Sequence, residues 1–153
     1  MTSLVEIEFI KVLSANDIGV TNSHQAGFLI PKRIARMNYF PSLDEFSPNP
    51  RARVNFLNLD INEILQCNYI YYNGRSLGFS TRSEFRLTGL TNFIKKMNFQ
   101  IGDQVAFGRQ SGHLILKKYE PVYSKKSAMH ESITAQDEII PFVSVNGWKI
   151  RER

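Results

Sequence analysis

Three charged residues, Arg82, Glu84 and Arg86, alternate with other residues in the stretch from Tyr71 to Leu90. In an extended chain, side chains two positions apart point to the same side, so these three would project together. Arginine pairs bidentately with O6 and N7 of guanine, and glutamate accepts a hydrogen bond from N4 of cytosine. This charged triplet therefore predicts contact with DNA bases in a site that contains G·C pairs. The alternative interpretation is a solvated hairpin with a surface ion pair of little energetic value.

The basic residues around the triplet are clustered. From residue 70 to residue 100 a single anion, Glu84, stands against five cations, Arg75, Arg82, Arg86, Lys95 and Lys96. The whole chain of 153 residues carries a formal net charge of +5, which favours attraction to a polyanion. Clustered positive charge is typical of nucleic-acid-binding proteins. We expect phosphates to be bound by Lys95 and Lys96, and by Lys32 and Arg33 of a predicted short helix.

A second candidate for contact is the polar loop from Ser14 to Gly27. Loops of this length without structure of their own are usually functional or disordered. Its donors and acceptors suit bases and phosphates, and they come from Ser14, Asn16, Asp17, Asn22, His24 and Gln25. Turn formation is the alternative role for Asn16 and Asp17, and a structural or surface role is the alternative for His24.

The elements that must position these residues are mostly short strands. Alternating or apolar runs predict strands at residues 4–13, 28–30, 51–59 and 67–72, a hairpin at 105–116 and a second hairpin at 139–150 with Asn146-Gly147 as a type I′ turn. Pro141 would place its strand at a sheet edge. Helical spacing predicts short helices at residues 32–37 and 90–97, the second with Thr88 as N-cap, while residues 60–65 form a turn or one helical turn. This pattern favours a mostly β barrel or sandwich.

The composition is that of one ordinary domain. The chain is long enough for a core that needs neither disulfides nor metals, and 42% of its residues are hydrophobic. A single cysteine, Cys67, excludes an internal disulfide, fits a reducing cytoplasm and is expected to be a small buried residue. The N-terminus is typical of neither a signal peptide nor a transit sequence, and no apolar run has the length of a membrane span.

Two groups of residues carry a family resemblance. Residues 9–19 (FIKVLSANDIG), followed by His24-Gln25-Ala26-Gly27 and Ile30-Pro31, resemble the opening of the N-terminal effector domain of EcoRII-type restriction endonucleases. Residues 70–73, Gly78 and residues 81–88 (TRSEFRLT) resemble the second recognition segment of that family. Residues 85–116 are similar to the helix–Gly-Asp–hairpin portion of plant B-three transcription-factor domains, a family with the same fold. Residues 121–153 resemble no family that we identify.

The resemblance implies a mostly β fold with short α-helices, a seven-stranded open pseudobarrel with two short helices. Two arms, Ser14 to Gly27 and Asn73 to Thr88, would enter the DNA major groove. By motif position, DNA contact is implied for Lys11, His24, Arg82, Glu84 and Arg86. With the polar and basic candidates added, the predicted interface consists of Lys11, Ser14, Asn16, Asp17, Asn22, His24, Gln25, Lys32, Arg33, Arg75, Ser80, Thr81, Arg82, Ser83, Glu84, Arg86, Lys95 and Lys96.

The chain departs from the family pattern at three positions. Leu29 stands where the family has an aromatic hydroxyl, and Phe85 and Ser80 stand where it has lysines. Because these changes remove polar or basic groups, they leave the target sequence open.

The sequence offers no nuclease site. Its acids are scattered, whereas a restriction nuclease needs clustered acids that hold a metal ion. The three histidines and Cys67 lack zinc spacing, and neither a Gly-x-Ser-x-Gly elbow nor a phosphate-binding Gly-Lys-Ser/Thr motif occurs. We therefore expect a domain that is not itself an enzyme and that binds neither a metal nor a cofactor.

We predict a sequence-specific double-stranded DNA-binding domain, the target-recognition module of a restriction endonuclease in the bacterial cytoplasm. Its site would be short and G·C-containing, and the family's namesake implies a CCWGG-like sequence. Residues 1–120 would form the pseudobarrel, and residues 121–153 a linker and hairpin that lead toward a nuclease domain of the same polypeptide. One alternative is a transcription-factor-like regulator of the same fold. Another is a β-barrel that binds a carbohydrate or peptide through Tyr69, Tyr71 and Tyr72, which otherwise pack the barrel.

Overall fold

The structure is a computed structural model that describes residues 4–19, 27–121 and 142–151. In these residues nine strands form one mixed sheet, in the order β2-β5-β4-β3-β7-β6-β1-β9-β8. The strands are β1 (Glu6–Val12), β2 (Gly27–Ile30), β3 (Arg51–Asn58), β4 (Glu63–Tyr72), β5 (Glu84–Thr88), β6 (Gln104–Gln110), β7 (His113–Tyr119), β8 (Phe142–Val145) and β9 (Trp148–Arg151). Three short helices accompany them, α1 (Lys32–Ala35), α2 (Gly74–Leu77) and α3 (Thr91–Lys96). The predicted mostly β class is confirmed, with nine strands and three helices where seven and two were expected.

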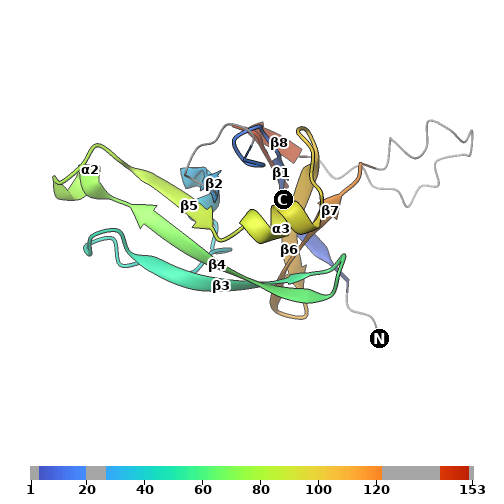
Figure 1. Ribbon diagram of the computed structural model, residues 1–153. Helices are drawn as coiled ribbons and strands as arrows, with labels where there is room; N and C mark the ends of the chain where they lie inside the picture. The colour runs from blue at the N-terminus through green and yellow to red at the C-terminus, as the bar shows by residue number, and fades with distance from the viewer. Residues whose placement is uncertain (1–3, 20–26, 122–141, 152–153) are drawn as a thin grey trace, which may run out of the picture.

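The sheet divides into a long ribbon and a more compact end. Strands β3, β4 and β5 form a twisted antiparallel ribbon whose far end carries α2, while β1, β6, β7, β8 and β9 gather at the other end (Figure 1). Because α2 belongs to the connection between β4 and β5, this connection projects away from most of the sheet. In β3, Val54 and Phe56 are buried while Arg53 and Asn55 are exposed, which is the alternation expected of a strand with one face on the core.

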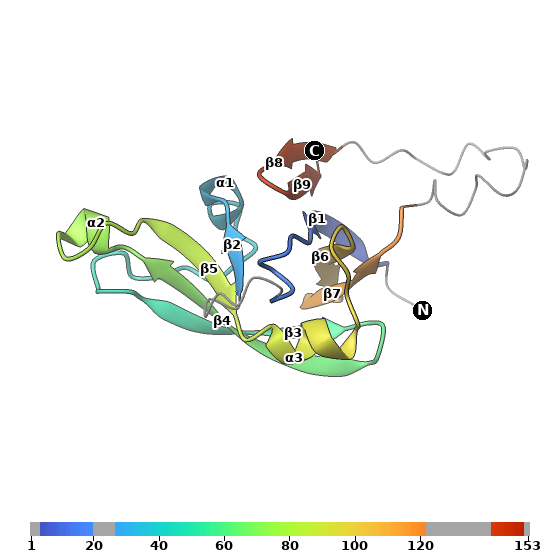
Figure 2. The ribbon, with the colours of Figure 1, turned by 45° about the horizontal axis from the view of Figure 1, so that its top comes forward.

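The two ends of the sheet meet through a side chain. Trp148 of β9 is 1% exposed, and its Nε1–H donates a hydrogen bond of 3.0 Å to the carbonyl oxygen of Leu29 in β2. The Trp148 ring also packs against Phe28 and Phe107 in the core. Figure 2 shows the β8–β9 hairpin on the same side of the molecule as β2 and α1. The sheet is thus nearly closed into a barrel, with an indole contact where backbone pairing is lacking.

Several local predictions can be compared with the structure. The type I′ turn of the last hairpin agrees with φ angles of 46° at Asn146 and 80° at Gly147, and β8 is an edge strand, while Pro141 lies outside the described residues. Cys67 is buried as expected, and burial raises the pKa of its thiol to about 12. The predicted helix at residues 32–37 is shorter, since α1 ends at Ala35.

Two local predictions are wrong. Thr88 is not the cap of α3, because it ends β5 and pairs with both Gly27 and Asn68 in the sheet. Gly89, with a φ of 87°, turns the chain, and Leu90 occupies the N-cap position without a side-chain hydrogen bond. Residues 60–65 are not all turn, because β4 already begins at Glu63 and pairs there with Asn58 of β3.

Asn73 fixes the base of α2 to the loop that precedes β3. It is 0% exposed, and its amide nitrogen donates to the carbonyl oxygens of Glu45 at 3.0 Å and Ser47 at 2.8 Å. Its Oδ1 accepts a hydrogen bond of 2.9 Å from the backbone N–H of Asn49. One side chain therefore satisfies three backbone groups of this loop.

Replacement of Asn73 by Ala should lower the free energy of unfolding by about 2–4 kcal/mol, because three hydrogen bonds are lost and backbone groups stay unsatisfied. Urea denaturation measures this change. Asn68→Ala, at an exposed position of the neighbouring strand β4, is the matched control and should shift stability by less than about 0.5 kcal/mol. Equal effects of the two substitutions would contradict the role assigned to Asn73.

Candidate nucleic-acid interface

The charged triplet forms one hydrogen-bonded cluster at the start of β5. The Nε of Arg82 and the Nε of Arg86 each donate to Oε1 of Glu84 at 3.0 Å, and Nη2 of Arg82 donates to the same oxygen. The three side chains therefore lie on one face, as their spacing predicts. The exposed fractions of the side chains are 36% for Arg82, 27% for Glu84 and 18% for Arg86, so the cluster is partly sheltered from solvent.

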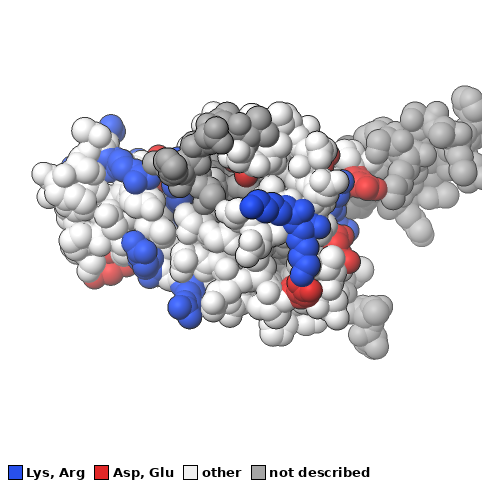
Figure 3. All heavy atoms as spheres, in the orientation of Figure 1, with Lys and Arg blue, Asp and Glu red and all other residues white. Residues whose placement is uncertain are grey.

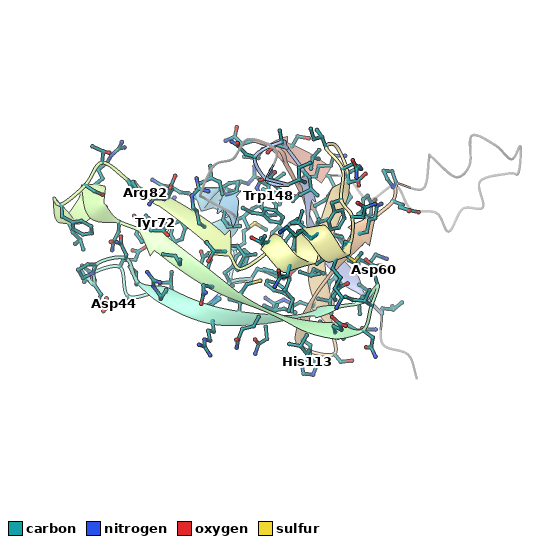
Figure 4. The ribbon with its side chains drawn as sticks, in the orientation of Figure 1. Asp44, Asp60, Tyr72, Arg82, His113 and Trp148 are labelled. Carbon is teal, nitrogen blue, oxygen red and sulfur yellow. The ribbon has the colours of Figure 1, made fainter. Side chains whose placement is uncertain are left out.

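An aromatic ring supports Arg82 from the neighbouring strand. The guanidinium carbon of Arg82 lies 3.7 Å from the ring centroid of Tyr72, which pairs with Glu84 in the register of β4 and β5. Figure 4 shows the two side chains next to each other on the ribbon, close to α2. The ring of Phe85 stacks on that of Tyr71, with 4.2 Å between the centroids, and on that of Tyr69, with 5.7 Å. Phe85 thus packs against the tyrosines of β4, while Glu84 and Arg86 on either side of it point to the opposite face of the ribbon.

The guanidiniums keep Glu84 ionised. Burial alone would raise the pKa of this carboxyl, but hydrogen bonds from Arg82 and Arg86, together with their charges, bring its pKa below the usual value of 4.5. The cluster therefore carries a net charge of one positive unit at neutral pH and holds its geometry through charge-assisted hydrogen bonds.

The cluster leaves donors and an acceptor for a ligand. Neither terminal nitrogen of Arg86, Nη1 or Nη2, forms a hydrogen bond with the residues that the structure describes, and neither does Oε2 of Glu84. Among the described residues, this ion pair thus keeps a guanidinium edge and a carboxylate oxygen without a hydrogen-bond partner. Such a pair complements a molecule that presents acceptors beside a donor.

A cavity of about 590 Å³ connects this cluster with the N-terminal part of the chain. Its lining comes from β1, the loop after β1, β2, β5 and the β8–β9 turn, and includes Lys11, Ser14, Asn16, Asp17, Gly27, Leu29, Arg86, Asn146 and Gly147. Gly27 permits this arrangement, because a Cβ there would lie 2.7 Å from the carbonyl oxygen of Leu87. Five of the predicted interface residues therefore border one hollow, four from residues 11–17 and Arg86 from β5.

Lys11 and Asp17 organise the beginning of the loop after β1. Oδ2 of Asp17 lies 3.1 Å from the Nζ of Lys11 and accepts hydrogen bonds from the backbone N–H of Ser14 at 2.8 Å and its hydroxyl at 2.9 Å. The alternative assigned to Asp17, turn formation, is thus present in the structure. Lys11 is only 7% exposed, so its head group acts here on the loop. Direct DNA contact by either residue stays a prediction.

The other predicted residues flank the cluster and the cavity. Lys32 of α1 donates a hydrogen bond of 2.9 Å to the hydroxyl of Ser83, which joins α1 to the segment before β5. Lys96 forms an exposed ion pair of 2.6 Å with Glu63, and Lys95 is exposed on the same helix. Basic side chains are visible over α3 and near the α2 end of the ribbon (Figure 3).

Four further candidates, Arg33, Arg75, Ser80 and Thr81, are exposed. Asn22, His24 and Gln25 lie outside the described residues, so their predicted contacts are untested.

Sequence reasoning missed the contribution of the β8–β9 hairpin to this site. The Trp148–Leu29 hydrogen bond joins residues 119 positions apart, and no local pattern indicates it. The one available signal was that Trp148 is the sole tryptophan and follows a turn, which is typical of a core anchor.

In the described part of the chain, no group of three or more His, Cys, Asp or Glu residues is placed to hold a metal ion. None of the described helices is long and apolar enough to cross a membrane.

Comparison with known proteins relates this chain to the N-terminal domain of a restriction enzyme. Residues 3–129 match the family described as "Restriction endonuclease EcoRII, N-terminal". The chain is 35% identical over 96 residues to the type II restriction enzyme EcoRII of Escherichia coli. That match covers 61% of this chain and 22% of the enzyme, so the chain spans about a fifth of the curated relative's length.

Two solved structures share the fold. The Arabidopsis FUS3–DNA complex superposes with a TM-score of 0.59 at 17% identity, and the match covers 75% of this chain and 98% of that one. The B3 domain of the UbaLAI restriction endonuclease, solved with cognate DNA, gives a TM-score of 0.55 at 17% identity and covers 97% of this chain and 88% of that one. The predicted B-three-like pseudobarrel is thereby confirmed.

The pKa shift of Glu84 gives a testable pH dependence. Because the pKa of Glu84 is lowered on folding, its ionised form stabilises the native state above the unfolded pKa of 4.5, and this contribution is lost as the pH falls through the folded pKa. Glu84→Gln should therefore destabilise the domain at pH 7, and the difference from wild type should close in acid. Urea denaturation at pH 7 and at about pH 3 measures the difference in unfolding free energy between wild type and variant at each pH.

Glu63→Gln is the matched control, because its ion pair with Lys96 is more than half exposed and should contribute little at either pH. A stability gap for Glu84→Gln that is the same at both pH values would contradict the assigned role.

Proposed function

The chain belongs to the family of EcoRII N-terminal restriction endonuclease domains, and on that premise we propose that it recognises a short double-stranded DNA site that contains G·C pairs. The family and the fold support a DNA-binding domain of the B3 type. The site sequence and the residues that read it are the finer part of the proposal.

The arrangement of Glu84 and Arg86 carries this proposal. A G·C pair presents the O6 and N7 acceptors of guanine and the N4 donor of cytosine in the major groove. The unused Nη groups of Arg86 match the guanine acceptors, and the unused Oε2 of Glu84 matches the cytosine donor. Glu84 and Tyr72 hold Arg82 in place, so Arg82 reaches DNA with Nη1 and the remaining N–H of Nη2. One fixed cluster thus offers complementary groups for a G·C edge.

Two arms would grip the duplex from the same side. The first is the loop after β1, whose described start is fixed by Lys11 and Asp17, and the second is the β4–β5 connection with α2 and the charged triplet. The cavity between them joins the two, since its lining draws on the first loop and on Arg86. Lys32, Arg33, Lys95 and Lys96 would bind phosphates around this centre and make the affinity salt-dependent.

The whole protein would combine this module with a nuclease domain in the same polypeptide. The chain corresponds to 22% of the length of EcoRII, which leaves room for such a domain in the relative. A CCWGG-like target and a bacterial cytoplasmic location are proposed from family likeness. A regulator of the same fold without a nuclease is the second candidate, favoured by the likeness to the FUS3–DNA complex.

The three tyrosines offer no exposed ring face on which a carbohydrate or peptide could stack. Tyr69 is 1% exposed, Tyr71 stacks on Phe85, and Tyr72 lies under the Arg82 guanidinium. Their rings are therefore engaged in packing within the ribbon.

Selection from a library of random duplexes, followed by sequencing, tests the proposed function. We expect enrichment of one short motif with at least one guanine at a fixed position, and binding that weakens steeply with salt. A folded protein that enriches no motif would refute sequence-specific recognition.

Arg86→Ala should weaken binding to the selected duplex by about 1–3 kcal/mol and relax the preference at one base pair, because the guanine acceptors lose their partner. Titration of selected and random duplexes measures both effects. Arg53→Ala is the matched control, an exposed arginine on β3 outside the cluster, and should leave the preference unchanged. An equal loss on selected and random DNA for Arg86→Ala would show that this arginine contacts only the backbone.

A further inference from the structure

The turn of the β8–β9 hairpin borders the same cavity as the proposed DNA-reading residues. Asn146 and Gly147 line it together with Lys11, Asn16 and Arg86. This hairpin lies outside residues 3–129, the part of the chain that the family match covers. It also belongs to neither of the two proposed arms, and the family match assigns it no role.

Three contacts fix the turn in position. The backbone N–H of Val12 donates a hydrogen bond of 2.8 Å to the carbonyl oxygen of Gly147. Trp148, the next residue, is anchored in the core and donates to the carbonyl oxygen of Leu29 at 3.0 Å. A Cβ at position 147 would lie 3.1 Å from the Nζ of Lys11, so the turn packs closely on that side chain. The turn is therefore held against the wall of the cavity before any ligand arrives, which lowers the entropic cost of a contact.

The side chain of Asn146 is available for binding. It is exposed, and it forms no hydrogen bond within the described ranges 4–19, 27–121 and 142–151. Its carboxamide offers two N–H donors and an acceptor oxygen. Because the turn itself is fixed, only the rotation of one short side chain must be restricted when a partner binds.

We propose that the Asn146-Gly147 turn is a third DNA-contacting element, in which the Asn146 carboxamide donates a hydrogen bond to an acceptor on the duplex. The acceptor is a phosphate oxygen or a base edge, since both present the same chemistry to an amide donor. This inference rests on the proposed function, because it takes the duplex bound over the cavity as its ligand. The duplex would then contact three parts of the cavity wall: the region of β1 and β2, strand β5, and the turn of the β8–β9 hairpin.

Turn chemistry alone also explains an asparagine at position 146, because Asn-Gly is the preferred pair for a type I′ turn. The chain contains a matched asparagine with which to separate the two explanations. Asn62 has a φ of 53°, close to the 46° of Asn146, and is exposed in the turn between β3 and β4. It does not line the cavity, so it shares the backbone conformation of Asn146 without its location.

The experiment compares Asn146→Asp with Asn62→Asp in the full chain. Aspartate tolerates the same left-handed backbone and keeps the turn, while it replaces the amide donor with a negatively charged acceptor. Thermal unfolding checks that both variants fold like the wild type. Fluorescence-anisotropy titrations with the duplex recovered by selection, and with a random duplex of equal length, give the affinities.

We expect Asn146→Asp to weaken binding by at least about fivefold, the factor equivalent to about 1 kcal/mol, with Asn62→Asp within about twofold of wild type. Because the charge of aspartate repels any duplex, the charge-free Asn146→Gly assigns the contact: equal weakening on both duplexes indicates a phosphate, and greater weakening on the selected duplex indicates a base edge. Asn146→Gly, which keeps a turn-forming pair and removes the amide, should weaken binding less, because it adds no charge.

Identical affinities of Asn146→Asp and Asn62→Asp, with wild-type DNA binding intact, would overturn this inference and leave the two-arm proposal standing. A wild-type chain that binds no duplex would instead refute the proposed function, and the third element with it.

Discussion

One carboxylate oxygen holds the proposed recognition surface together. Oε1 of Glu84 accepts hydrogen bonds from both Arg82 and Arg86, two cations that would otherwise repel each other and move through many rotamers. The ring of Tyr72, on which the guanidinium of Arg82 lies, further restricts the rotamers of Arg82. The sheet therefore fixes the directions of these donors and of one acceptor. If the same groups were on a flexible loop, they would have to become ordered on binding, which would cost entropy.

This cluster depends on the near closure of the sheet. Strand β5 lies between β2 and β4, and β2 is tied to β9 through the indole of Trp148. Because β9 in turn pairs with β1, the start of the loop after β1 is brought to the same cavity as Arg86. The small barrel therefore does more than bury a core, since it holds the start of this loop and Arg86 at one cavity. The same connectivity explains why a hairpin at the end of the chain borders a site built from its beginning and middle.

The features that could be predicted from the sequence are those with a local cause. The common face of Arg82, Glu84 and Arg86 follows from the two-residue period of a strand, and the Asn146-Gly147 turn follows from the backbone freedom of its residues. Thr88 was misjudged because a cap and a strand end have similar compositions, and the left-handed Gly89 decides between them. The partners of Asn73 and Trp148 had no local signal, because each contact joins segments that are distant in the chain. The cavity was likewise beyond prediction, since it exists only after the sheet has closed.

The central claim is that a fixed guanidinium of Arg86 reads guanine in the major groove, and atomic substitution in the DNA tests it most directly. In 7-deazaguanine a C–H replaces N7, which removes one acceptor and leaves base pairing intact. Affinities would be measured for the selected duplex with this substitution at each guanine in turn, for the wild type and for Arg86→Ala. The account predicts that one guanine shows a loss of about fivefold or more in the wild type and little further loss in the variant. If every substituted duplex binds as tightly as the parent, or if the variant loses as much as the wild type at each guanine, the account is contradicted.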